Sequence, residues 1–187
     1  MSSRHLALAL CAPLLLSCWS WGCASRTAAV PPATVPFVDL IRYSGTWHEL
    51  ARLPMWFQRD CLQSQAEYTL LSENTITVLN SCPTTGGGTK KAHGIATVVE
   101  EKSNAKLTVR FDNWFSRLFP GLTTGDYWIL WLDPAYQTVL VGTPDRKFLW
   151  ILARTPSVDR ETFAQLVAHA RELGFATEKL LVFQQDR

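Results

Sequence analysis

The stretch GTWHELARLP, residues 45–54, alternates its side chains between two faces and then ends at a proline. Alternation with a period of two predicts a β-strand, because successive side chains of a strand point to opposite faces of the sheet. Pro54 marks the end of the strand, since proline cannot donate to a sheet ladder. We therefore expect a first strand over residues 45–53, opened by a Gly-x-Trp sequence.

The chain beyond this strand continues as short alternating segments separated by Gly, Pro, Asn, Asp and Ser. Connections this short favour antiparallel pairing of sequential neighbours. The eight predicted strands are 45–53, 65–71, 75–82, 90–100, 105–111, 124–132, 137–142 and 148–154.

The period then changes to that of a helix over about residues 157–173, with Ser157 as the expected N-cap and Gly174 at the C′ position. Residues 179–183 can add one more short strand. The predicted fold is all-β with one C-terminal helix, namely an eight-stranded antiparallel up-and-down β-barrel with the helix packed outside.

The N-terminal segment has the composition of an export signal rather than of folded structure. Residues 6–16 form an apolar run that is too short to span a bilayer, and Leu15-Leu16-Ser17-Cys18 resembles the lipobox of bacterial lipoproteins. This predicts a signal peptide over 1–17, lipidation of Cys18, and a flexible Ser/Ala/Pro/Thr-rich tether over 18–36. Cys23 is a competing lipidation site, and an ordinary secreted leader is the alternative. Trp19, instead of Asp, favours the outer membrane.

The charge balance and the remaining cysteines restrict the partners. A net charge of +2 without any basic run gives no indication of nucleic acid binding. Cys61 and Cys82 lie at the same end of a predicted hairpin, so export predicts a disulfide between them, with two buried free thiols as the alternative. Two cysteines are too few for a metal site.

Three motifs in this order resemble the lipocalin family, specifically its bacterial outer-membrane lipoproteins. They are Gly45-x-Trp47 on the first strand, a partial match of Gly-Asp-Tyr around Asp126 on the sixth, and Arg154 at the end of the eighth. The resemblance covers about residues 37–185, and the predicted barrel domain spans 37–187. It implies that Trp47 closes one end of the barrel and that Arg154 packs on its indole face, as a structural plug.

Strand parity, counted from Trp47 and Arg154, predicts which side chains line the lumen and its mouth. The predicted ligand-binding residues are Glu49, Ala51, Leu53, Met55, Phe57, Tyr68, Val78, Asn80, Val109, Phe111, Trp114, Tyr127, Phe148, Trp150 and Leu152. The apolar loop 113–121, which contains Trp114, has three readings: mouth lining, membrane contact or subunit interface.

The function that the resemblance implies is binding of a hydrophobic or amphiphilic ligand, such as a fatty acid or lysophospholipid, for storage, transport or envelope maintenance. Arg59 or Arg117 is a candidate to meet an anionic head group. An enzyme and a structural lipoprotein with a filled barrel are the alternatives. His48, His93 and His169 fall on separate elements, which favours no catalytic site and no cofactor. We expect a monomer or weak homodimer, anchored by lipid in the outer membrane and facing the periplasm.

Overall fold

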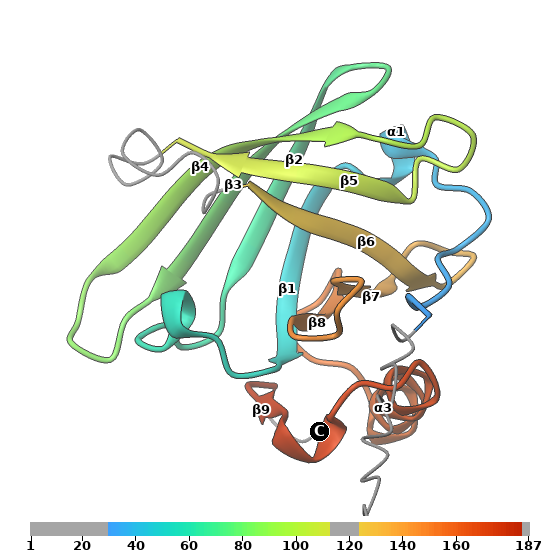
Figure 1. The fold of residues 1–187 in the computed structure, drawn as a ribbon. Helices are drawn as coiled ribbons and strands as arrows, with labels where there is room; N and C mark the ends of the chain where they lie inside the picture. Colours follow the sequence, from blue (N-terminus) through green and yellow to red (C-terminus); the bar gives the residue numbers. More distant parts are fainter. Residues whose placement is uncertain (1–29, 113–123, 185–187) are drawn as a thin grey trace, which may run out of the picture.

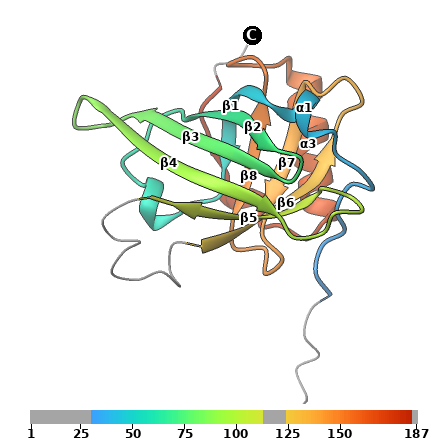
Figure 2. The ribbon, with the colours of Figure 1, turned by 90° about the horizontal axis from the view of Figure 1, so that it is seen from above.

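A closed antiparallel barrel forms the body of the protein. The computed structural model describes residues 30–112 and 124–184. The strands of the barrel are β1 (Gly45–Arg52), β2 (Gln65–Ser72), β3 (Thr75–Pro83), β4 (Thr89–Val98), β5 (Lys106–Phe111), β6 (Thr124–Leu132), β7 (Thr138–Gly142) and β8 (Leu149–Ala153). Neighbours in sequence pair with each other, and β1 pairs with both β8 and β2, which closes the barrel (Figures 1 and 2). The predicted fold class is confirmed.

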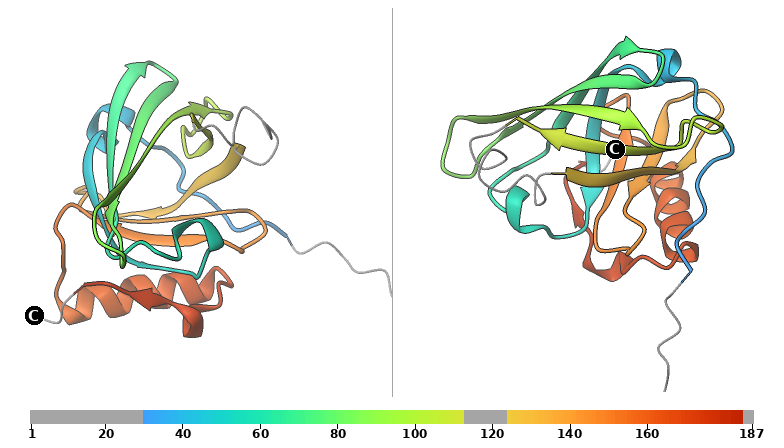
Figure 3. Two further views of the ribbon diagram at one scale, coloured as in Figure 1. Left: turned by 90° about the vertical axis from the view of Figure 1, so that its left-hand side faces the viewer. Right: turned by 45° about the horizontal axis from the view of Figure 1, so that its top comes forward.

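The other elements lie at the two ends and on one side of the barrel. They are α1 (Leu40–Tyr43), η1 (Trp56–Gln58), α3 (Arg160–Glu172), η3 (Thr177–Lys179) and β9 (Leu181–Val182). Helix α3 lies outside the barrel along β7 and β8 (Figure 3). Its N-cap is Asp159, which accepts a hydrogen bond from the Thr162 N–H, so the prediction of Ser157 was wrong by two residues. Gly174 follows the helix with a left-handed φ of 86°, as expected at C′.

The protein has two apolar clusters, one on the inward face of the strands and one on their outward face. The inner cluster contains Trp47, Tyr68, Val78 and Leu152 among others, and the closing helix α1 adds Tyr43. The outer cluster joins alternate residues of β1, β6, β7 and β8 to α3 and to Phe175, which follows the helix. The alternation of the sequence therefore serves two cores, one inside the barrel and one under the helix.

A β-bulge in β1 overturns part of the predicted lumen lining. The register of β1 against β8 shifts between Glu49 and Ala51, so two consecutive residues, Leu50 and Ala51, both face the outer cluster. Ala51 and Leu53 were predicted to face the lumen, and both instead belong to the cluster under α3. The extra residue reverses the parity of everything after it, which turns Arg52 inward instead.

The segment 30–36 lies against the barrel and does not behave as the end of a tether. The Val35 N–H donates to the carbonyl of Ile129 at 3.0 Å, and the Val30 carbonyl accepts a hydrogen bond from Arg146. Pro32 is buried. The predicted tether boundary at Pro36 is therefore wrong, and residues 1–29, with Cys18, lie outside the described residues. No helix among those that are described has the length and apolar character needed to cross a membrane.

Candidate functional site

The closed end of the barrel is built around Trp47 and Arg154. Trp47 is fully buried, and its indole N–H donates to the Tyr43 carbonyl at 2.9 Å. The guanidinium carbon of Arg154 lies 3.9 Å from the centre of the Trp47 ring. The same guanidinium donates to the carbonyls of Arg42, Tyr43, Thr46 and Tyr136. The stacking of Arg154 on Trp47, which the family resemblance implies, is therefore present, and the hydrogen bonds of Arg154 go to the backbone around it.

Glycine is required at position 45 for two reasons. Its φ is 98°, which residues with a Cβ rarely adopt, and a Cβ there would lie 3.2 Å from Arg154 Nη1. Gly45 of the Gly-x-Trp motif thus leaves room for Arg154 at the end of β8.

The position assigned to the second motif needs correction. Asp126 is exposed and faces away from the lumen, because Tyr127 next to it faces inward and strand residues alternate. The aspartate and tyrosine at the closed end are instead Asp133 and Tyr136, in the turn after β6. The Asp133 carboxylate accepts a hydrogen bond from the Gln137 N–H, and the Tyr136 carbonyl accepts one from Arg154.

Three tyrosine hydroxyls meet inside the barrel next to Trp47. The oxygens of Tyr43 and Tyr127 are 2.6 Å apart, and those of Tyr68 and Tyr127 are 2.9 Å apart. Tyr43 also stacks on Tyr68, with ring centres 5.6 Å apart. Burial raises the pKa of Tyr68 to about 12 and the pKa values of Tyr43 and Tyr127 well above 10. All three are therefore neutral hydroxyls at physiological pH. We call them the tyrosine triad.

Most of the predicted lining residues lie on the inner face. The inner cluster includes or contacts Tyr68, Val78, Val109, Phe111, Tyr127, Trp150 and Leu152. Asn80 shares the parity of Val78 along β3 and is half-buried. Phe111, Tyr127 and Trp150 are only half-buried although they pack on this cluster. These three inward-facing aromatic rings are therefore not fully enclosed by neighbouring side chains.

The connection after β1 and the connection before β8 contact each other through aromatic rings. The ring centre of Phe57 in η1 lies 5.5 Å from that of Phe148, which directly precedes β8, and the ring centres of Phe148 and Trp150 are 6.2 Å apart. Met55, which precedes η1, is buried, whereas Trp56 is 70% exposed. Trp114, which the sequence placed at the mouth, lies outside the described residues.

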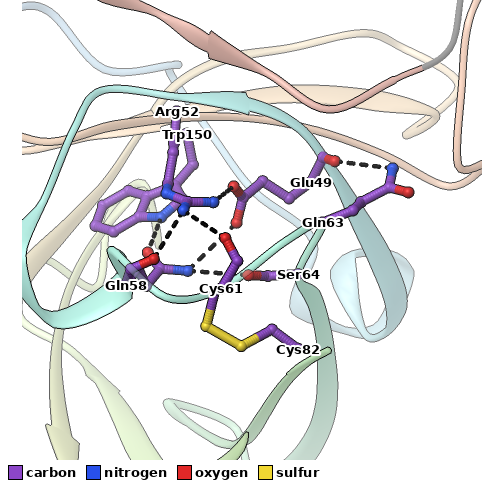
Figure 4. A network of polar contacts seen from close by, with 8 residues as sticks. All are labelled: Glu49, Arg52, Gln58, Cys61, Gln63, Ser64, Cys82 and Trp150. Carbon is purple, nitrogen blue, oxygen red and sulfur yellow. Dashed lines mark hydrogen bonds and ion pairs between the residues drawn. A yellow bond between two sulfur atoms is a disulfide. The ribbon is translucent and has the colours of Figure 1, made fainter. Parts of the chain in front are cut away.

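A buried ion pair joins β1 to the connection between β1 and β2 (Figure 4). Arg52 Nη1 contacts Glu49 Oε1, and both side chains are almost completely buried. Arg52 Nη2 donates to the carbonyls of Gln58 and Cys61 at 2.8 and 3.0 Å. The guanidinium also lies 4.4 Å from the centre of the Phe183 ring, which follows β9. Burial raises the pKa of Glu49, and Arg52 opposes this rise.

Gln58 connects this ion pair to the rest of the mouth. Its amide nitrogen donates to Glu49 and to Ser64, and its amide oxygen accepts from the Trp150 indole N–H at 3.0 Å. The predicted disulfide between Cys61 and Cys82 is present, with Cα atoms 5.5 Å apart, and ties the same connection to β3 (Figure 4). The connection is thus held by a covalent bond and by a polar network.

Sequence reasoning missed Arg52, Gln58 and Tyr43 as interior residues. Simple alternation points Arg52 outward, and nothing local in the sequence shows the bulge that reverses it. Tyr43 precedes the first strand in a short helix that was not predicted. An arginine three residues after a predicted inward Glu49 was the one available signal, because a buried carboxylate needs a partner.

The histidines lie on separate elements, as expected. His48 is on the outer face of β1, where partial burial lowers its pKa. His93 is exposed on β4, and His169 of α3 stacks on Trp131 with ring centres 5.3 Å apart. Within residues 30–112 and 124–184, no group of three or more His, Cys, Asp or Glu side chains is arranged to hold a metal ion.

Comparison with known proteins decides the family. The model of the lipocalin-like domain matches residues 38–185, which is the whole described barrel with its helix. The chain is a lipocalin. Its resemblance extends to bacterial members: the outer membrane lipoprotein Blc of Vibrio cholerae is 33% identical over 185 residues, covering 98% of this chain and 99% of that protein.

Other relatives show how widely this lipocalin's sequence and fold recur. Temperature-induced lipocalin-1 of Arabidopsis thaliana is 42% identical over 148 residues, covering 76% of this chain and 77% of that protein. Among solved structures, insecticyanin from the tobacco hornworm Manduca sexta superimposes with a TM-score of 0.63 at 18% identity, covering 86% of each chain. The latter similarity concerns the fold alone.

Proposed function

We propose that this lipocalin is a lipid-anchored outer-membrane protein that holds a long-chain amphiphile, such as a fatty acid or lysophospholipid, in its barrel. The observation that carries the proposal is an apolar, aromatic interior that is plugged by Trp47 at one end and contains half-buried rings such as Trp150. Apolar sites with a few placed polar groups are typical of small-molecule pockets.

An acyl chain suits such an interior on energetic grounds. Each methylene removed from water contributes about 0.8 kcal/mol, so a chain lying along apolar walls binds without any charged contact. The head group then remains at the mouth, at the end opposite Trp47. Arg59 is a candidate to meet an anionic head there, because it is 79% exposed next to η1.

The anchor and location rest on the leader sequence and on the bacterial relatives. Cys18 follows a lipobox-like sequence, and the Vibrio cholerae relative, an outer membrane lipoprotein by name, aligns with nearly the whole chain. Several acyl chains on one cysteine would hold the protein stably on a membrane. Radiolabelled palmitate incorporation that is lost in Cys18→Ser and retained in Cys23→Ser tests the anchor.

Ligand binding is tested on the chain from residue 30 onward. Both apolar clusters, the disulfide and the barrel closure lie within the described residues, so this part contains its own core. We expect it to bind a fluorescent fatty acid and to release that fatty acid when lysophospholipid is added as a competitor. A barrel that binds no fatty acid or lysophospholipid even at high micromolar concentration would instead support the structural lipoprotein with a filled interior. Native mass spectrometry of the protein purified from its membrane identifies the natural ligand.

A further inference from the structure

The tyrosine triad has more hydrogen-bond donors than its own contacts use. Three hydroxyl groups carry three hydrogens, and the two oxygen–oxygen contacts among Tyr43, Tyr68 and Tyr127 consume two of them. No other hydrogen bond of these hydroxyls occurs in the described part of the chain, so one hydrogen has no acceptor. A buried donor without a partner costs free energy until something accepts from it.

The central tyrosine of the triad is the least buried of the three. Tyr43 and Tyr68 are 1% and 6% exposed, but Tyr127, whose oxygen touches both others, is only half-buried within the inner cluster. The side chain of Tyr127 is therefore the member of the triad that a ligand entering the barrel can reach.

We propose that the hydroxyls of Tyr43, Tyr68 and Tyr127 form a hydrogen-bonding subsite that receives an uncharged oxygen, a hydroxyl or a carbonyl, at the inner end of a bound long-chain lipid. This deepens the proposed function and rests on it. The ligand class becomes acyl chains that carry an oxygen far from their head group, in addition to plain chains.

The charge of the group follows from the surroundings of the triad. Burial raises the pKa of each of the three tyrosines even though the cationic Arg154 lowers those of Tyr43 and Tyr68. An environment that disfavours a phenolate also disfavours a carboxylate at the same place. An ionised head group therefore stays at the mouth, and a neutral oxygen reaches the triad.

A matched pair of ligands tests the subsite: a fatty acid and the ω-hydroxy fatty acid of the same length, compared over a series of lengths. Without a partner, burying a hydroxyl in an apolar lumen weakens binding by about 5- to 100-fold. In the native protein we expect, at the best length, an affinity for the ω-hydroxy acid within about 3-fold of that for the plain acid, or higher.

The variant that removes the subsite is the triple change Tyr43→Phe, Tyr68→Phe and Tyr127→Phe. Removing all hydroxyls together conserves volume and leaves no orphaned partner, so the fold is better preserved than in a single variant. We expect the affinity for the ω-hydroxy acid to fall at least about 5-fold more than the affinity for the plain acid. The matched control is Tyr136→Phe, which removes a hydroxyl outside the triad that accepts the Asp39 N–H.

A spectroscopic measurement keeps the test independent of the variant. A fatty acid with an isotope-labelled keto carbon near its far end should show a lowered carbonyl stretching frequency when bound to the native protein. An unshifted carbonyl, or a ratio of the two affinities that changes by less than about 3-fold in the triple variant, overturns the subsite while leaving plain fatty acid binding intact. Failure of the plain acid itself to bind overturns the proposed function, and the subsite with it.

Discussion

The two ends of β1 are each held by an arginine, and the two arginines are held differently. Arg154 at the closed end stacks on Trp47 and donates only to neutral backbone carbonyls. Arg52 at the other end is 1% exposed, contacts the Phe183 ring, and pairs with the buried carboxylate of Glu49. Its Nε has no hydrogen-bond partner among the described residues.

The difference teaches that similar side-chain contacts can have different consequences. A guanidinium on carbonyls and an indole leaves no buried charge behind when it is removed. A buried ion pair leaves its carboxylate without compensation when the arginine is removed. We therefore expect the closed end to tolerate change better than the mouth.

The largest expected effect is that of Arg52→Ala. Because it leaves the Glu49 carboxyl buried without its cationic partner, we expect the free energy of unfolding to fall by about 3–5 kcal/mol in urea titration. The double variant Glu49→Leu with Arg52→Met should recover most of this loss, since it removes both charges and fills their volume. A double variant as unstable as the single one would show that the ion pair itself stabilises the mouth.

The disulfide is the second support of the mouth. Replacing Cys61 and Cys82 together by Ala should lower the free energy of unfolding by about 3 kcal/mol, because the unfolded chain regains the entropy of a loop about 20 residues long. A reducing agent should lower the free energy of unfolding of the native protein and leave that of the variant unchanged. An equal response of both would argue against this bond as the source.

Arg154→Ala should have a smaller effect at the closed end. Loss of the stacking and of the carbonyl contacts is expected to cost about 2 kcal/mol, with fatty acid affinity nearly unchanged. Unaltered thermal unfolding combined with lost ligand affinity would contradict the role of a plug.

The pH dependence of stability distinguishes the two ends by the group that titrates. Burial raises the pKa of Glu49 above 4.5, so the stability that this group contributes is present below pH 4.5 and is lost as the pH rises through the raised pKa. Glu49→Gln should remove this decline. At the closed end the pKa of Tyr68 is raised to about 12, so its contribution is present below pH 10 and is lost as the pH rises towards 12.

Ultraviolet absorbance of tyrosinate and denaturant titrations at each pH measure both effects. The alkaline change should persist in Glu49→Gln, and the acidic change should persist in Tyr68→Phe. Coupling between the two would show that the ends do not act independently.

Much of the fold could be predicted from the sequence because its signals are local. The strand segments differ from the predicted ones by at most two residues at any end, since alternation and turn residues act over a few positions. Tyr68, Val78, Val109, Trp150 and Leu152 face the inner cluster, as their parity predicts, because their strands keep a regular register up to these residues. Ala51 and Leu53 do not, because one bulge precedes them.

The sequence by itself determined the number and order of strands, the pairing of Cys61 with Cys82 and the contact of Trp47 with Arg154. Alternation, hairpin geometry and a family motif suffice for these. Only the tertiary structure decided that Arg52 turns inward to Glu49. It also decided that three tyrosines from α1, β2 and β6 meet, with one more hydroxyl hydrogen than their mutual contacts use. A bulge depends on how one strand fits its neighbour, and a donor count depends on which distant side chains converge, so neither is written in any local stretch of the chain.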